Sequence, residues 1–139
     1  MIGAEWINVK EFLPDEGERV LVISKFHHIS SERYTDYGIT GRNAPPKLFR
    51  PDGYKPGEDV SWWMCVPTDK WKLYEEEKPS LPGFYLTMEN YGSITSQEWK
   101  QSYLTGEYEF FPFRSGFNMG KLMYWREIPE LPLGVVLKA

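Results

Sequence analysis

The chain has 139 residues, about the commonest size for a single domain. Hydrophobic residues make up 41% of it and aromatic residues 17%, which argues against disorder because each ring can bury roughly 150–250 Å². The formal net charge of −4 at pH 7 argues against a general nucleic-acid-binding protein, which needs a surplus of Lys and Arg, and is compatible only with a local basic patch.

The number of cysteines and the length of the apolar runs indicate the cellular compartment to expect. Cys65 is the single cysteine, so no disulfide can form within the chain, which fits a reducing compartment. The N-terminal residues lack the basic start and long apolar run of a signal peptide. No apolar run approaches the roughly 18 residues that cross a membrane. We therefore expect a cytoplasmic protein with no membrane partner.

Short apolar runs separated by turn residues predict strands in the first half of the chain. Asp15-Glu16-Gly17-Glu18 is typical of a turn, and residues 25–28 of a hairpin loop. The density of Gly and Pro over residues 38–59 excludes long regular elements there. After the opening residues 6–9, the predicted strands are 20–23, 29–34, 47–50 and 60–66.

The second half repeats this plan. Its predicted strands are 71–74 (or the first turn of a helix), 84–88, 94–99 (with a short helix through Tyr103 as the alternative), 108–111 and 122–128. The apolar tail, residues 131–139, is either an added strand or an oligomer contact. We predict a mainly β protein of short antiparallel strands, with at most two short helices.

Four motifs that recur in the same order suggest that the chain contains two copies of one unit. The strongest is a motif around Trp63 that recurs 62 positions later around Trp125. In both copies an aromatic residue precedes the Trp, two residues follow it, and then come an aliphatic residue and Pro. The others pair Trp6 with Trp71, Leu13-Pro14 with Leu81-Pro82, and residues 29–34 with 94–99. We predict two tandem units, 1–69 and 70–139. Each is too small to be stable alone, so we expect one body with a pseudo-twofold axis and a shared core.

The first unit resembles the DUF551 family. Its opening, Trp6-Ile7-Asn8-Val9 followed by Leu13-Pro14, the run Val20-Leu21-Val22 and the ending Trp63-Met64-Cys65-Val66-Pro67 are similar to that family's motifs. The second unit departs from the pattern, since no Ile follows Trp71 and Arg126 stands where Met is usual. The resemblance implies a small protein of a phage, prophage or gut bacterium, and it supplies no catalytic or binding residue.

No catalytic or metal motif is present, and the weaker candidates have structural explanations. His27 and His28 are adjacent, so on extended backbone they point to opposite faces and are poorly placed to share a metal ion. Cys65 lies in an apolar run and is expected in the core, since a nucleophile would need a nearby base and an electropositive setting. We expect no metal and no cofactor.

The candidate binding residues are aromatic and basic. Trp63 and Trp125 are expected to be core anchors, and Trp62 and Tyr124 to point the other way, either between the units or into solvent. Exposed aromatics suit contacts with protein, glycan or single-stranded nucleic acid. The long loop adds basic and aromatic residues: Arg42, Lys47, Phe49, Arg50 and Tyr54.

Three functions follow from these residues. The favoured one is a small non-catalytic binding or adaptor protein with a protein partner. The second is a nucleic-acid or glycan binder that uses Trp62, Tyr124 and the basic loop. The third is an enzyme with a site around His27, His28 or Cys65. Fold alone does not choose among them.

Overall fold

The computed structural model describes residues 5–36, 46–112 and 120–138. These residues form ten strands in one antiparallel sheet and contain no helix, which confirms the mainly β prediction. The short helix that was the alternative for residues 94–103 is not formed, because residues 94–101 alternate between the two faces of a strand. Arg42 lies outside the described residues.

The strands follow the predicted runs closely. In the first half they are β1 (Ile7–Asn8), β2 (Arg19–Ser24), β3 (Ile29–Thr35), β4 (Leu48–Arg50) and β5 (Val60–Cys65). In the second half they are β6 (Lys72–Leu73), β7 (Gly83–Glu89), β8 (Ile94–Gln101), β9 (Tyr108–Pro112) and β10 (Leu122–Arg126).

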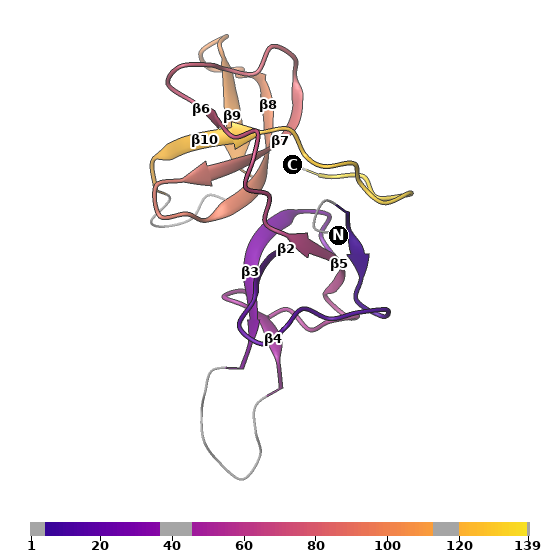
Figure 1. The fold of residues 1–139 in the computed structure, drawn as a ribbon. Helices are drawn as coiled ribbons and strands as arrows, with labels where there is room; N and C mark the ends of the chain where they lie inside the picture. Colours follow the sequence, from indigo (N-terminus) through magenta and orange to yellow (C-terminus); the bar gives the residue numbers. More distant parts are fainter. Residues whose placement is uncertain (1–4, 37–45, 113–119, 139) are drawn as a thin grey trace.

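Each half pairs its strands in the same order. The first half runs β1-β5-β2-β3 with β4 added on β3, and the second runs β6-β10-β7-β8 with β9 added on β8. The halves meet where β3 pairs with β8, at the single register pair Ser30 and Thr95. In Figure 1 the first half, from indigo to magenta, lies below the second half, from pink to yellow.

Two hydroxyl groups reinforce this short junction. The backbone N–H of Ile29 donates to Ser96 Oγ at 2.9 Å, and the N–H of Ile94 donates to Ser31 Oγ at 3.0 Å. The two contacts are reciprocal: an isoleucine of each half bonds a serine of the other. They take the place of ladder hydrogen bonds at a point where only one residue pair is in register.

Both faces of β2 are buried, which explains its continuous apolar run. Val20 and Val22 face the core of the first half, and Leu21 and Ile23 face a second core that both halves share. The shared core also contains Ile29, Met64, Leu86, Ile94 and Leu137. A strand buried on both faces needs β-branched and aliphatic residues throughout, rather than alternation with polar ones.

The C-terminal tail completes the shared core without forming a strand. Leu137 is 7% exposed there, and Leu131 and Val135 pack against the same cluster. The N–H of Lys138 donates to the carbonyl of His27 at 3.1 Å, which ties the tail to the first half. In Figure 1 the yellow tail runs beside the junction between the halves.

Trp63 and Trp125 are core anchors, as the sequence predicts. Both are buried, and each indole N–H donates to a backbone carbonyl: Trp63 to Phe12 at 2.8 Å and Trp125 to Glu77 at 2.7 Å. The two acceptors lie at matching positions in the chain, Phe12 before β2 and Glu77 before β7. Each tryptophan therefore fixes a loop to its own half.

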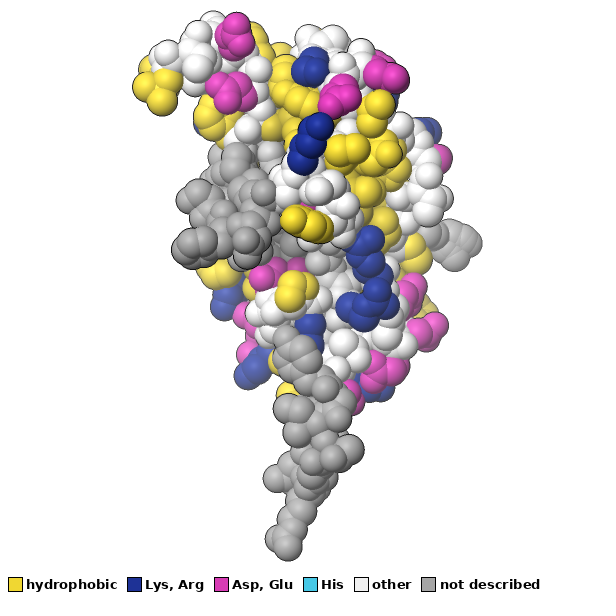
Figure 2. Space-filling model, turned by 90° about the vertical axis from the view of Figure 1, so that its left-hand side faces the viewer, with side chains coloured by type: hydrophobic (Ala, Val, Ile, Leu, Met, Phe, Trp, Pro, Cys, Tyr) yellow, Lys and Arg dark blue, Asp and Glu magenta, His cyan; other side chains and the backbone are white. Residues whose placement is uncertain are grey.

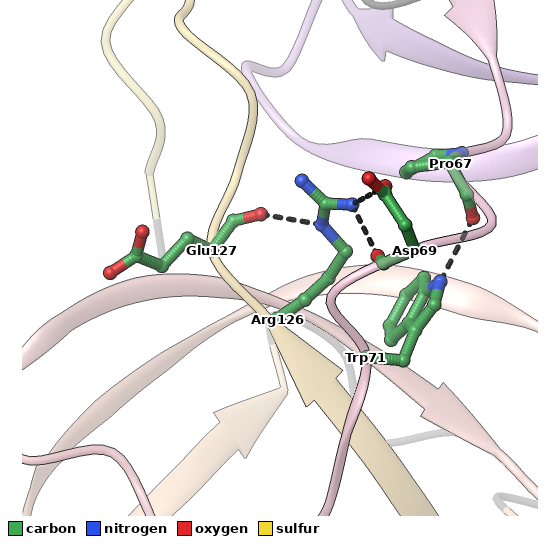
Figure 3. Close-up of polar contacts among 5 residues, drawn as sticks. All are labelled: Pro67, Asp69, Trp71, Arg126 and Glu127. Atoms are coloured by element: carbon green, nitrogen blue, oxygen red, sulfur yellow. Dashed lines mark hydrogen bonds and ion pairs between the residues drawn. The ribbon is translucent and has the colours of Figure 1, made fainter.

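Arg126 holds the segment that joins the halves (Figure 3). Its guanidinium donates from Nη1 to the carbonyl of Asp69 at 2.6 Å and to its carboxylate at 3.1 Å, and from Nε to the carbonyl of Glu127 at 2.9 Å. Nearby, Trp71 Nε1 donates to the carbonyl of Pro67 at 2.8 Å. Arg126, which stands where the first unit has Met64, therefore fixes the linker between the halves.

Candidate anion-binding groove

Three arginines stand in a row across neighbouring strands. Arg19 on β2 is the register partner of Arg33 on β3, and Arg33 is the partner of Arg50 on β4. Cross-strand partners point to the same face, and strands lie about 4.8 Å apart, so the row spans about 10 Å. Like charges directly opposite each other destabilise a sheet. This row is therefore an unfavourable feature of the protein on its own.

The guanidinium groups of Arg19 and Arg33 donate to neutral oxygens. Arg19 donates to Ser31 Oγ at 3.2 Å and to the carbonyl of Gly92, and Arg33 donates to the carbonyl of Gly17 at 2.5 Å. Within the described part of the chain, neither Arg19 nor Arg33 forms an ion pair with a carboxylate. Partial burial lowers the pKa of Arg19, and the neighbouring charge of Arg33 lowers it further. The two side chains therefore present positive charge that no acidic group neutralises.

The row lines a groove between the halves of about 420 Å³. Its other walls include Ser31 and Glu32 of the first half, and Tyr91 and Ser93 of the second. Tyr91 lies in the turn between β7 and β8 and is 75% exposed. We call this feature the arginine groove. It combines positive charge, hydroxyl groups and an exposed aromatic ring.

The positive charge is local rather than spread over the protein. On the face in Figure 2, acidic and basic side chains intermix over the lower part, and hydrophobic side chains gather in the upper part. The formal net charge is −4. A ligand is thus attracted by the groove itself, because beyond about 8–10 Å the mixed charges are screened at physiological salt.

Glu32 is buried in the wall of the groove and is held by hydrogen bonds. It is 2% exposed, accepts from Ser30 Oγ at 2.8 Å and accepts from the backbone N–H of Asp52 at 3.1 Å. Burial raises the pKa of Glu32 to about 8, and the nearby carboxyl of Asp52 raises it too. At neutral pH this carboxyl is mostly protonated, so it subtracts little from the positive charge of the groove.

The residues predicted from the long loop separate in the structure. Arg50 lines the arginine groove, whereas Lys47 is exposed and lies 3.8 Å from Glu16. Phe49 is fully buried in the core of the first half, where Tyr54 packs against the same cluster. Phe49 therefore has no exposed surface with which to contact a ligand.

Trp62 and Tyr124 lie on β5 and β10, in different halves of the sheet. Trp62 is half-buried against the shared core, and Tyr124, on β10, is 37% exposed. Neither lines the arginine groove. Beside Arg50, the groove is lined by Arg19, Arg33 and Tyr91, which the sequence did not single out. The predicted loop at 25–28 would pair Arg19 with Tyr34, so it did not reveal this row. The observed register pairs Ile23 with Ile29 and thereby places Arg19 opposite Arg33.

The candidates for catalysis gain no support from their surroundings. Cys65 is half-buried, and burial followed by the charge of Glu18, whose carboxylate lies 3.7 Å from the thiol, raises the pKa of Cys65. An activated thiol needs the opposite shift. His27 has a positive φ of 65° in the β2–β3 turn. In the described ranges, no three His, Cys, Asp or Glu side chains are placed to hold a metal ion.

The described residues also contain no helix of the length and apolarity needed to cross a membrane. Comparisons of the chain with protein-family models, with curated proteins and with solved structures found no match.

Proposed function

We propose that this protein is a non-catalytic binding protein that holds an oxyanion of its partner in the arginine groove. The observation that carries the proposal is the row Arg19, Arg33 and Arg50 on three adjacent strands. A row of like charges costs stability when the protein is free. A phosphate or carboxylate bound across it would remove that cost, and guanidinium groups bind both bidentately.

Single-stranded nucleic acid is the partner that this groove fits best. Tyr91, 75% exposed at the rim, offers a ring on which a base can stack. A row of about 10 Å suits a few nucleotides rather than a long duplex footprint. The net charge of −4 agrees with a local contact rather than with an extended basic surface along a nucleic-acid backbone. An acidic segment of a protein is the competing partner.

The proposal extends to the origin of the chain. We hold that the two halves descend from one duplicated DUF551-like unit in a cytoplasmic protein of phage or other mobile-element origin. The common strand order and the matching indole contacts of Trp63 and Trp125 support the duplication. At the sheet positions of Arg19, Arg33 and Arg50, the second half has Phe84, Glu98 and Phe111. The arginine groove would therefore be a specialisation of the first half.

Fluorescence anisotropy with a labelled twelve-nucleotide oligothymidine tests this function. We expect salt-dependent binding that Arg33→Gln weakens about tenfold, since a charge-assisted contact contributes about 1.5–3 kcal/mol. Tyr91→Ala should weaken binding with little change in the salt dependence. Lys10→Gln, which removes one charge from an exposed position outside the groove, is the matched control and should bind normally.

The outcomes separate the alternatives. Equal loss in Lys10→Gln and Arg33→Gln would mean that only overall charge matters and would overturn the site. No binding of the oligonucleotide at low salt, together with Arg33-dependent binding of a labelled poly-glutamate peptide, would transfer the site to an acidic protein partner. No binding of either probe would refute the function.

A further inference from the structure

A second cavity lies in the other half of the protein, and Ser93 lines both it and the arginine groove. It has a volume of about 300 Å³, at the lower end of the range for small-molecule sites. Thr87 and Glu89 of β7, Thr95 and Gln97 of β8, and Glu109 and Phe110 of β9 contribute to its lining. We call it the polar cavity.

The matching space in the first half holds buried valines beside the polar Ser24, Ser30 and Glu32. The cross-strand partner of Trp63 is Val22, and the partner of Trp125 is Thr87, so Thr87 takes the place of a buried valine. Val20, Val22 and Val60 are at most 1% exposed and belong to the core of the first half. The two halves thus share a strand order but differ in what they enclose.

Several polar groups of the cavity lack partners. Gln97 is 8% exposed, and its only hydrogen bond within the described residues runs from Nε2 to Thr95 Oγ1 at a long 3.4 Å, so its amide oxygen has no donor there. One oxygen of Glu89 accepts from the N–H of Gly120 at 3.1 Å, and one oxygen of Glu109 accepts from Thr105 Oγ1 at 3.1 Å. The second oxygen of each carboxylate has no donor among the described side chains and backbone.

These free groups define the ligand by its chemistry. An amide oxygen and two carboxylate oxygens are three acceptors, and a protonated primary amine supplies three N–H donors. No Lys, Arg or His side chain contributes to the described lining, so the two carboxylates repel anions and attract a cation. The rings of Tyr74 and Phe110, 5.9 Å apart, also favour a cation.

We infer that the polar cavity is a binding site for a small organic amine, held by its ammonium group among Gln97, Glu89 and Glu109. Phe110 and Leu122 contact the carbon skeleton of the amine, and the hydroxyls of Thr87 and Thr95 take any further polar group. The site is distinct from the arginine groove, since the two attract ligands of opposite charge and use different strands, although Ser93 lines both.

Three four-carbon probes of equal length test the charge requirement: 1,4-diaminobutane, 1,4-butanediol and succinate. Binding is followed by isothermal calorimetry and by amide chemical shifts of the labelled full chain. We expect the diamine to bind and to shift the amides of Thr87, Thr95 and Gln97, and the diol and the diacid to have no effect. Glu109→Gln, which keeps the shape, should weaken the diamine about tenfold, and Glu107→Gln, exposed and outside the lining, should leave it unchanged.

A second variant guards against loss of folding as an explanation. Thr87→Val installs the residue found at the matching position of the first half, and it should keep the melting temperature while weakening the diamine. Equal binding of the diol and the diamine would overturn the inference, because it would remove the role of charge. Absence of shifts at millimolar diamine, or equal weakening in Glu107→Gln, would overturn the site itself. All these results are independent of oligonucleotide binding.

Discussion

Ser96→Ala should destabilise the whole protein although it removes a single oxygen atom. The hydroxyl of Ser96 accepts the N–H of Ile29 across the junction, and both residues are at most 1% exposed. Water has no access to replace the lost acceptor, so the N–H of Ile29 is left buried and unpaired at a cost of about 1–3 kcal/mol. The volume lost is small, so packing adds little. We expect a loss of about 2 kcal/mol.

Urea denaturation followed by tryptophan fluorescence measures this loss. A change of about 2 kcal/mol shifts the midpoint by about 1 M for a slope near 2 kcal/mol/M, and lowers the melting temperature by about 4–8 °C. Ser61→Ala is the control, because Ser61 is exposed on β5 and its hydroxyl makes no hydrogen bond to another described residue. A loss below about 0.5 kcal/mol in Ser96→Ala, or an equal loss in Ser61→Ala, would refute the role of the hydroxyl at the junction.

Three further variants probe the same framework. Because the pKa of Glu32 is raised, the folded protein favours the protonated form of this side chain. The stability that Glu32 contributes is fully present below about pH 4.5 and is lost as the pH rises to about 8. Glu32→Gln should therefore flatten the dependence of the unfolding free energy on pH over that window, as measured in urea titrations. Arg126→Met removes both hydrogen bonds from Nη1 to Asp69 and should cost about 1 kcal/mol, with faster proteolysis of the linker; unchanged cleavage would contradict the role of Arg126 in fixing the linker. Leu137→Ala should cost about 2–4 kcal/mol by calorimetry, whereas Leu133→Ala, fully exposed, should be neutral.

The strands were predictable because each is a short run bounded by Gly, Pro or charged residues. The run of β2 predicted a buried strand, and the motif shared by residues 29–34 and 94–99 predicted two strands that occupy equivalent places, β3 and β8. The pairing of those two strands with each other was not predictable from the runs. It depends on Ser31 and Ser96, whose hydroxyls look like ordinary exposed polar residues in the sequence.

The candidate site was predicted only in part, and the reason is geometric. The sequence predicted binding residues among the basic and aromatic residues of the long loop, and of the described ones only Arg50 lines the groove. Phe49 does not, because it alternates to the buried face of β4. Arg19 and Arg33 are separated in the chain and meet only through the register of the β2–β3 hairpin. Tyr91 comes from the other half, and no local pattern places its turn beside that hairpin.

The tail that closes the shared core has a consequence for synthesis. Ile29 faces that core from β3, and its cover includes Leu137, about a hundred residues later in the chain. At a translation rate of about 5–20 residues per second, the apolar face of the first half waits about 5–20 s for this cover. During that interval the nascent chain presents Leu21, Ile23 and Ile29 beside the unpaired edge of β3, which is the kind of surface that chaperones bind and that aggregates. Folding of this protein is therefore expected to finish only after the last strand and tail are made.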